Sequence, residues 1–343
     1  MKKLPLLLIA FALLSCKEKP KAMSEAEKMK IFLSTQQEDL KPTRWDTGDT
    51  TMGNEDRLDL FYKEALDLKG GYVGVGSLQN FMLGAWAKSE YMWLVDFTRI
   101  VVATNRIHIE FIKRSKTPEE YVGLWQKKNR QKALAIIDET FKTDAQYKFI
   151  RKSYFNAFFY VNKRINLDLV LSKRYKYPIW LNTQPLYDHL YKLATSGKIQ
   201  TIRGDLSGKI SLQSIGNTAR KMKLPMRLLY FSNAEEYVAV CWVPCNPQFR
   251  TNMLSMPVDA KSKVFRTVSS PNRRVYTWAP GSELTTSRGF HYNIQPGTLF
   301  NQWMKFEGKM GIPTMLKGAT VDAKNGISKC VSAPPVAQAT KVQ

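Results

Sequence analysis

The sequence predicts an α/β fold in which a mainly parallel sheet carries helices on both faces and a helical insertion. Three observations predict it. The stretch 70–96 has the pattern of a strand, a glycine turn, a helix and a second strand. The run 225–231 is apolar without alternation, which is typical of parallel strands buried on both faces. Between these parts, residues 117–197 show helical spacing and no strand pattern.

The first strand of this stretch, at 72–73, is followed by the turn Gly74-Val75-Gly76-Ser77. Glycines let the backbone turn sharply and approach a ligand closely. The second apolar run ends on Asp96, where nucleotide-binding α/β units hold the hydroxyls of a ribose. Gln79 stands where a dinucleotide fingerprint has its third glycine, which disfavours pyrophosphate binding. A plain tight turn is the alternative interpretation.

The chain is strongly basic. Its 343 residues carry 52 basic and 29 acidic side chains, a formal net charge of +23. Such an excess favours anionic surroundings such as lipid head groups, lipopolysaccharide, nucleic acid or an acidic ligand. The lysines are scattered, so an ordinary solvated surface is the alternative. Only three histidines occur, and no metal is expected.

The N-terminus predicts the location of the protein. Two lysines precede the apolar run 4–14, and 1–15 reads as a signal peptide. The sequence Leu13-Leu14-Ser15-Cys16 resembles the lipobox of bacterial lipoproteins. That resemblance implies cleavage before Cys16, a lipid on its sulfur and attachment to the membrane. Lys17 stands where inner-membrane lipoproteins often have aspartate, which implies the outer membrane of the cell envelope.

Removal of 1–15 takes two lysines from the +23 total and leaves +21. Of the remaining cysteines, Cys241, Cys245 and Cys330, some pair could oxidise in an exported protein. A zinc site is disfavoured, because no Cys-x-x-Cys pair or histidine cluster accompanies them.

The predicted organisation follows the chain. Residues 16–50 form a tether that contains a helix beginning with the capping-box pattern Ser24-x-x-Glu27. The sheet domain takes 51–116 and 198–317, the helical insertion 117–197, and a flexible tail 318–343. Expected helices outside the insertion are 56–68, a segment around 212–222, and 298–304. Expected later strands are 199–202, 225–231, 263–267 and 289–295.

Polar residues follow four of the predicted strands, and their succession resembles S-adenosylmethionine-dependent methyltransferases. The resemblance implies a Rossmann-like domain, S-adenosylmethionine as the cofactor, and a cleft at the carboxyl ends of the strands. The phrases GVGSLQN and YFSNAEEY also resemble signatures of an uncharacterised bacterial family. By the methyltransferase resemblance the cofactor-binding residues are Gly74, Gly76, Ser77, Asp96, Asp205 and Ser232, and the catalytic residues are Asn233 and Glu235.

Each of these positions has a structural alternative. Asp96 can cap the following helix, since a carboxylate accepts hydrogen bonds from free amides there. Asp205 can form a turn, and the segment 232–235 can be a helix N-terminus. The sequence also lacks the acidic residue that the methyltransferase family has just before its glycine turn.

Other chemistries are disfavoured by the sequence. It contains no Gly-x-Ser-x-Gly, HExxH or Walker pattern. Nucleic-acid binding is unlikely, because it would rest on charge alone. A lipoprotein beyond the inner membrane would not meet S-adenosylmethionine, so enzyme status stays open. One hypothesis is a methyltransferase-type group-transfer enzyme. The other is a non-catalytic lipoprotein that binds anionic envelope or host ligands and has a degenerate nucleotide site.

Overall fold

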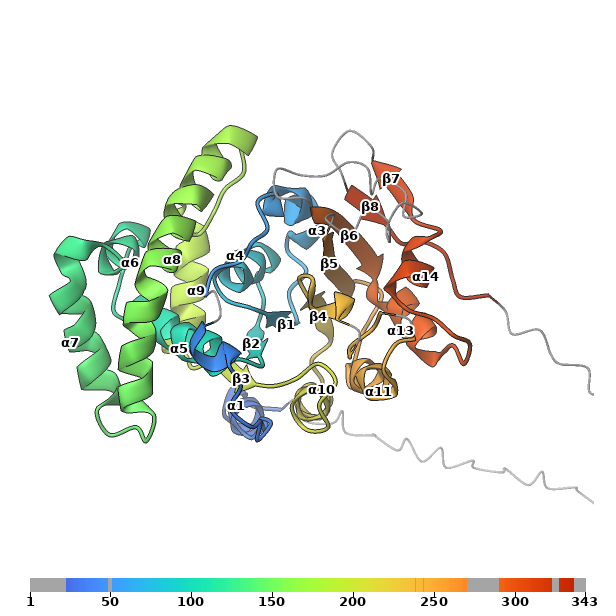
Figure 1. The fold of residues 1–343 in the computed structure, drawn as a ribbon, viewed down its shortest axis with the longest axis horizontal. Coiled ribbons are helices and arrows are strands. Elements are labelled where there is room, and N and C mark those ends of the chain that lie inside the picture. The colour runs from blue at the N-terminus through green and yellow to red at the C-terminus, as the bar shows by residue number, and fades with distance from the viewer. Residues whose placement is uncertain are drawn as a thin grey trace, which may run out of the picture.

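The computed structural model describes residues 23–48, 51–237, 239–242, 244–269, 290–322 and 327–335. Within these ranges an eight-stranded sheet has the order β3-β2-β1-β4-β5-β6-β8-β7 (Figure 1). Strands β1 to β5 are parallel, β6 is antiparallel to β5, β8 is parallel to β6, and β7 is antiparallel to β8. The predicted α/β fold with a mainly parallel sheet is therefore confirmed. The strands are β1 (Gly71–Val75), β2 (Tyr91–Asp96), β3 (Ile199–Arg203), β4 (Met226–Tyr230), β5 (Lys263–Ser269), β6 (Phe290–Pro296), β7 (Thr320–Asp322) and β8 (Ile327–Lys329).

The central strands are buried on both faces, as their unbroken apolar runs predict. Every residue of β2 is buried, and its side chains alternate between two hydrophobic cores. Met92 and Leu94 belong to the core on one face, whereas Trp93 and Val95 belong to the core on the other. This alternation follows from the two-residue period of a strand.

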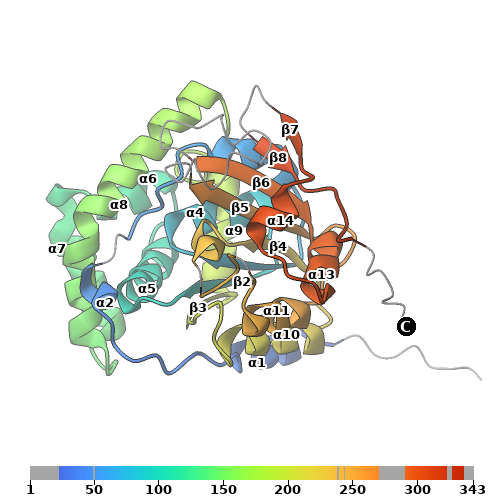
Figure 2. The same ribbon diagram turned by 45° about the vertical axis from the view of Figure 1, so that its right-hand side comes forward.

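Helices cover both faces of the sheet (Figures 1 and 2). One face packs against α4 (Leu78–Ala87), α5 (Arg99–Lys113) and α9 (Gln184–Thr195). The other packs against α1 (Glu25–Leu33), α10 (Ser211–Lys221), α11 (Pro247–Ser255) and α13 (Gly297–Lys305). Shorter helices are α2 (Trp45–Gly48), η1 (Leu58–Phe61), α3 (Tyr62–Ala65), η2 (Lys127–Asn129), η3 (Ala234–Glu236) and α14 (Ile312–Leu316).

All the regular elements between β2 and β3 are helices. It contains α5, α6 (Pro118–Leu124), α7 (Arg130–Phe141), α8 (Tyr147–Tyr175) and α9. Thr117 caps α6 by accepting a hydrogen bond from the backbone of Glu120, and Pro118 follows it at the first turn. The aromatic segment 147–160 forms the first half of α8, and Tyr154 packs against Trp125 in the core. We call α6, α7 and α8 the cap; it lies at the left in Figure 1.

The structure corrects the two ends of the predicted organisation. Ser24 and Glu27 do form a capping box, but the described part of the tether is packed against the sheet. Phe32 is fully buried, with its ring 4.9 Å from that of Trp93. The segment 318–343 is not all tail, because β7 and β8 within it join the sheet beside β6. The predicted helix 56–68 is shorter, with η1 and α3 spanning Leu58–Ala65.

The cysteines divide into a pair and a single thiol. Cys241 and Cys245 form a disulfide, and Cys330 is free and buried. Cys16 and the signal peptide lie outside the described residues.

Candidate functional site

The predicted site residues share one edge of the sheet. In parallel strands all carboxyl ends lie on the same edge, and β1 to β5 are parallel. Gly76 and Ser77 follow β1, Asp96 ends β2, Asp205 follows β3, and Ser232 follows β4. We call this edge the rim. The strand order changes direction at β1, which lies between β2 and β4, and such a switch point is where open α/β sheets bind ligands.

The space next to Gly74 is filled by two side chains of the protein, Tyr72 and Asn80. The Tyr72 hydroxyl donates a hydrogen bond of 2.6 Å to Oδ1 of Asn80. A Cβ atom on Gly74 would lie 2.2 Å from that Asn80 oxygen and 2.3 Å from the Tyr72 hydroxyl. The glycine is therefore needed for close approach, but the approaching groups are side chains of β1 and α4. Gly76 has φ +96°, a conformation that favours glycine, and its carbonyl accepts a hydrogen bond from Asn105.

A carboxylate that the sequence did not indicate reaches the rim from the segment 51–57. Glu55 is fully buried, and its Oε1 accepts a hydrogen bond of 2.7 Å from the Tyr230 hydroxyl. The same oxygen accepts hydrogen bonds from the hydroxyls of Ser232 and Thr267. Three donors from the ends of β4 and β5 thus converge on one carboxylate oxygen. These hydrogen bonds offset the cost of burying one of the two carboxylate oxygens.

The cap holds this segment in place. Arg164 of α8 donates hydrogen bonds to the backbone carbonyls of Gly53, at 2.9 Å, and Glu55, at 2.6 Å. Asp168, one turn further along α8, pairs with the Arg164 guanidinium at 2.9 Å. Both side chains of this pair are at most 3% exposed. We call the segment 51–57 the strap, because it runs between the cap and the rim.

Several buried polar atoms under the strap retain hydrogen-bonding capacity. Glu55 Oε2, Gln79 Oε1, Ser77 Oγ and Thr51 Oγ1 have no hydrogen-bond partner among the described residues. A Cβ on Gly53 would lie 2.8 Å from the Gln79 oxygen and 3.0 Å from Glu55 Oε2, so these two oxygens face one spot. Polar atoms of this kind are what water or a small polar ligand would contact.

The two aspartates are engaged in their own turns. Asp96 Oδ1 accepts hydrogen bonds of 2.9 Å from both the backbone and the hydroxyl of Thr98, at the start of α5. Asp205 Oδ1 accepts hydrogen bonds of 2.8 Å from both the backbone and the hydroxyl of Ser207. Both carboxylates therefore close a local turn two residues long, and Asp96 does not cap α5, whose N-cap residue is Thr98.

The two residues assigned to catalysis, Asn233 and Glu235, follow Ser232 in the chain. Ser232, assigned to cofactor binding, adopts a left-handed backbone with φ +53°, and Asn233 immediately precedes the single turn η3. Glu235 is 1% exposed and pairs with the equally buried Arg266 at 2.6 Å. Burial raises the pKa of Glu235, and the Arg266 guanidinium opposes this shift. Arg266 also donates to Asn293 and Gln295 of β6, so Glu235 belongs to a buried polar network of the sheet.

The comparison with known families covers both the rim and the strap. A family model described as "Domain of unknown function (DUF7790)" matches residues 50–331. The chain belongs to the DUF7790 family. No curated protein matches it in sequence. The matched span begins at the strap and ends just after β8, so the DUF7790 domain encloses the helical insertion and the last two strands.

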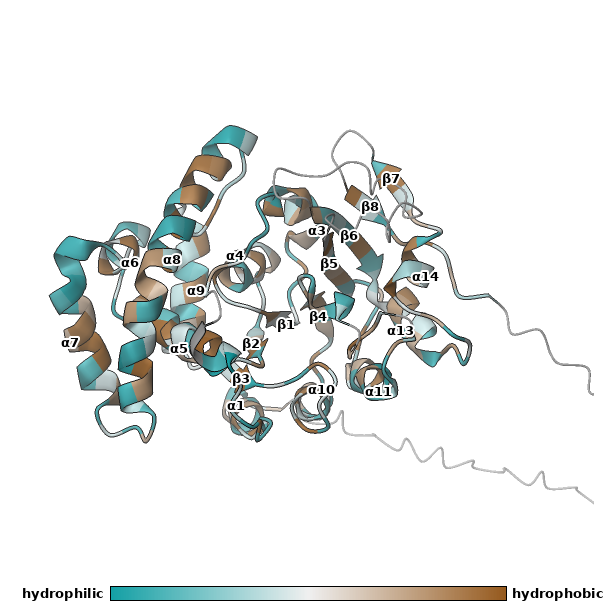
Figure 3. Ribbon diagram, in the orientation of Figure 1, coloured by the Kyte–Doolittle hydropathy of each residue, from teal (hydrophilic) through white to brown (hydrophobic). Residues whose placement is uncertain are grey.

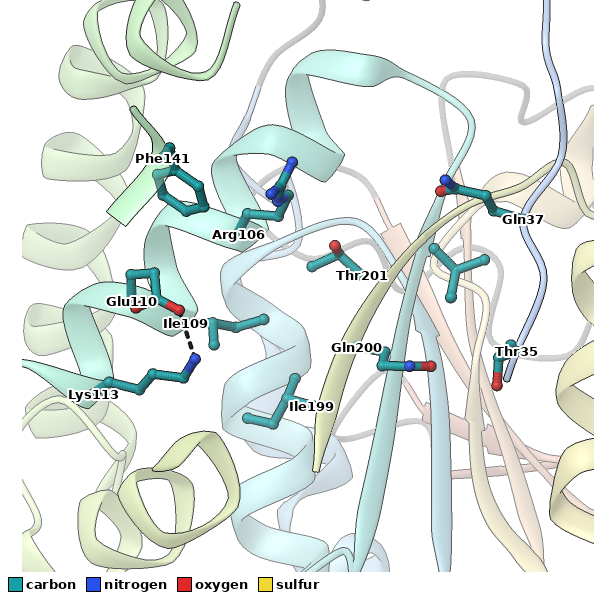
Figure 4. Close-up of a pocket in the computed structure, with 11 residues that line it drawn as sticks. Thr35, Gln37, Arg106, Ile109, Glu110, Lys113, Phe141, Ile199, Gln200 and Thr201 are labelled. Carbon is teal, nitrogen blue, oxygen red and sulfur yellow. Dashed lines mark hydrogen bonds and ion pairs between the residues drawn. The ribbon is translucent and has the colours of Figure 1, made fainter. Parts of the chain in front are cut away.

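A surface cavity of the DUF7790 chain lies away from the rim. It has a volume of about 370 Å³ and lies at β3, the edge strand (Figure 4). Glu110 and Lys113, which form an ion pair, and Arg106, which pairs with Asp144, line it from α5. Ile199 and Thr201 line it from β3. None of the predicted cofactor-binding residues contributes to this cavity.

The described residues lack two further features. They contain no cluster of at least three His, Cys, Asp or Glu residues that could hold a metal ion. They also contain no helix of the length and apolarity needed to cross a membrane.

Proposed function

We propose that this DUF7790 protein is a lipid-anchored, non-catalytic protein of the bacterial cell envelope that binds anionic ligands. In this proposal its α/β domain is a Rossmann-like, methyltransferase-type domain whose nucleotide site has been filled by the protein's own side chains. One observation supports the loss of a nucleotide site: at the switch point Glu55 is hydrogen-bonded to Tyr230, and the Tyr72 and Asn80 side chains lie against Gly74.

The strand order supports a Rossmann-like origin of the domain. The first five strands have the order β3-β2-β1-β4-β5, all parallel, with helices on both faces. A glycine turn follows β1, and Asp96 ends β2. These features favour descent from a nucleotide-binding fold, and fold alone does not imply that the activity is retained.

The contacts at the rim support loss of the nucleotide site. A ribose at Asp96 would have to compete with the backbone and hydroxyl of Thr98, which the carboxylate already binds. A ligand over Gly74 would have to displace the hydrogen-bonded Tyr72 and Asn80 side chains. Displacement would leave buried polar groups unsatisfied, at roughly 1–3 kcal/mol each.

The lipid anchor and the anionic ligand rest on the sequence. The lipobox-like Leu13-Leu14-Ser15-Cys16 supports an envelope address, and the +21 charge of the chain after 1–15 supports anionic partners. A location beyond the inner membrane also fits a protein that has no use for a cytoplasmic cofactor.

Calorimetry tests the loss of the nucleotide site. Titration of S-adenosylmethionine or its demethylated product into the chain should give no heat of binding. Heat that disappears in Asp96→Ala would contradict the proposal and favour the second candidate, group transfer. That candidate is supported by the shared rim of Gly76, Asp96, Asp205 and Ser232 at the switch point.

The anchor has an independent test. Expression of the full chain in a bacterial host should place it in the membrane fraction, with acyl groups on Cys16 detected by mass spectrometry. Cys16→Ser should release the protein from the membrane. The matched control is Cys330→Ser, at a free cysteine buried in the fold, which should leave the protein in the membrane fraction. If Cys16→Ser blocks cleavage, the variant stays in the membrane fraction through residues 1–15. Its mass then shows that these residues are still attached. Release of the wild type would contradict the anchor.

A further inference from the structure

Helix α8 is the longest element of the cap, and Figure 1 shows it between α7 and the sheet domain. It has 29 residues, which corresponds to a length of roughly 43 Å. Its inner face is packed into the core through Ile150, Tyr154, Ala157, Val161 and Ile165, spaced three and four residues apart. The opposite face is free of neighbouring elements, and hydrophobic and hydrophilic turns alternate along the helix (Figure 3).

The outer face of α8 exposes large apolar side chains. Phe159 is 66% exposed, Val170 60%, Phe155 43% and Tyr160 38%. Positions 155 and 159 are one helical turn apart, so the two phenylalanine rings lie on one stripe. Exposed apolar groups gathered on one face mark an interaction surface, whereas isolated ones do not.

Lysines extend this stripe in both directions. Lys148 and Lys152 precede the aromatic residues, and Lys163 and Lys173 follow them, all with exposed side chains. At about 100° per residue, all four lysines lie within roughly 80° of Phe155 around the helix axis, so they share its face of the helix. We call the eight residues the outer stripe: Lys148, Lys152, Phe155, Phe159, Tyr160, Lys163, Val170 and Lys173.

No carboxylate of α8 offsets these charges. Residues 147–176 contain eight basic side chains and one acidic one, Asp168, which is buried against Arg164. On the neighbouring α7, Asp138 pairs with Arg151 and Glu139 with Arg114. Among the described residues, none of the four lysines of the outer stripe takes part in an ion pair.

We propose that the outer stripe of α8 binds the anionic lipid surface of the membrane that carries the chain's own anchor. This inference rests on the proposed function, because it takes the envelope address from the lipidated Cys16. Aromatic rings partition to the level of the lipid head groups, and lysines extend past them toward the phosphates. A helix with aromatic residues between basic ones lies in the plane of such an interface.

Charge complementarity and shape select lipid over other anionic partners. A straight helix of roughly 43 Å presents a linear, shallow stripe that suits a flat surface. Val170, the second most exposed of its apolar residues, has no ring on which a nucleic-acid base could stack. Nearby Lys127 and Lys128 at η2 add further positive charge at the start of α7, where Arg130 lies over the Phe158 ring.

The test uses a chain that begins at Lys17, which lacks Cys16 but keeps every described residue. Cosedimentation with phosphatidylcholine vesicles should be weak, and vesicles containing roughly 30% phosphatidylglycerol should retain the protein in a salt-sensitive manner. Phe155→Ser with Phe159→Ser, and separately Lys152→Glu with Lys163→Glu, should each lower binding at least about tenfold. Thermal melting of each variant verifies that these exposed substitutions leave the fold intact.

The matched controls lie on α10 and the turn before it, on the other side of the sheet. Lys209→Glu with Lys221→Glu makes the same charge change, and Ile210→Ser removes an apolar group that is 42% exposed. Controls that weaken binding as much as the stripe variants would overturn the inference, since the charge of the whole chain would then suffice. Tighter binding to a single-stranded oligonucleotide through the same residues would also overturn it.

The outcome is separable from that of the proposed function. Because the tested chain has no anchor, failure of lipidation at Cys16 leaves vesicle binding unchanged. Loss of vesicle binding in turn leaves the acylation of the full chain and the nucleotide calorimetry unaffected.

Discussion

At the rim, one carboxylate oxygen of Glu55 accepts hydrogen bonds from a tyrosine, a serine and a threonine. Burial raises the pKa of Tyr72, Tyr230 and Tyr292 well above the ordinary value, and the charge of Glu55 adds to this effect. These hydroxyls therefore stay protonated and able to donate at any pH at which the protein is folded. The cluster fixes the strap to the sheet by polar contacts that hydrophobic burial alone would not specify.

Glu55→Ala tests that role. The substitution leaves the hydroxyls of Tyr230 and Ser232 buried without their acceptor, so the free energy of unfolding should fall by about 2–4 kcal/mol. Glu55→Gln keeps one oxygen acceptor and should cost about half as much. Urea unfolding followed by tryptophan fluorescence measures both. Equal stability of Glu55→Ala and wild type would show that the strap is not held by this carboxylate.

His108 gives the protein a defined response to acid. It is fully buried beside the Tyr121 hydroxyl at 2.7 Å, and burial lowers its pKa from 6.5 to about 3. Between these values the unfolded chain binds a proton that the folded chain does not, so stability falls as the pH drops. When the pH drops from 6.5 to 4, the unfolding free energy of the wild type should fall by about 3 kcal/mol more than that of His108→Gln. Parallel pH profiles of the two proteins would refute this assignment.

Single residues also show how far sequence reasoning reaches. The turn at Gly74 and Gly76 and the hydrogen bonds from Thr98 to Asp96 depend on neighbours within a few positions, so local patterns can predict them. Glu55 cannot be found in that way, because its partners Tyr230 and Ser232 lie 175 and 177 positions away. The sequence also does not predict that Asn80 fills the space next to Gly74. A polar residue early in a helix has no local pattern that indicates such a contact.

Helix α8 connects the cap to the rim through its inner face. Arg164 binds the strap carbonyls and pairs with Asp168, and burial raises the pKa of Asp168 while the guanidinium opposes the shift. The same helix exposes the outer stripe on its opposite face. Its two faces therefore have separate roles, and substitutions on one should not disturb the other.

Arg164→Met should be among the most damaging single changes in the cap. It leaves Asp168 as a buried carboxylate without its partner and frees the carbonyls of Gly53 and Glu55, at a cost of about 3–5 kcal/mol. Adding Asp168→Leu removes the unpaired charge and should recover part of the loss. Chemical denaturation of the wild type, both single variants and the double variant gives the coupling energy. A coupling near zero would mean that the pair contributes nothing beyond its separate contacts.

The helices and strands differ in how well the sequence predicts them. The buried strands β1, β2 and β4 and the helices α6, α10 and α13 follow from apolar runs, caps and helical spacing. Strands β7 and β8 have only three residues each, too few to show a period, and they form because β6 offers an open edge. Phe32 of α1 is fully buried, and Met29 and Ile31 pack beside it against the same core, although nothing in the local sequence predicts this docking.

Across the whole molecule, segments near the two ends of the chain cover the outer sides of β3 and β6. At one edge the backbone of Glu38 donates to the carbonyl of Arg203 at the end of β3. At the other, β8 pairs with β6, and the Cys330 amide donates to the carbonyl of Ile294. Exposed sheet edges are templates for association with other chains, so this coverage reduces pairing between copies of the chain.

A chain ending at Lys317 would lose this protection on one side. It removes β7 and β8, exposes the edge of β6, and uncovers core side chains that Ile327 and Cys330 bury. We expect a loss of at least about 3 kcal/mol in unfolding free energy, together with concentration-dependent association in sedimentation velocity. A chain ending at Pro335 is the control, because it keeps every described contact, including the hydrogen bond from Trp303 to the carbonyl of Ser332. If the shorter chain remained monomeric and as stable as this control, β7 and β8 would be an appendage to the fold. The sheet would then end at β6.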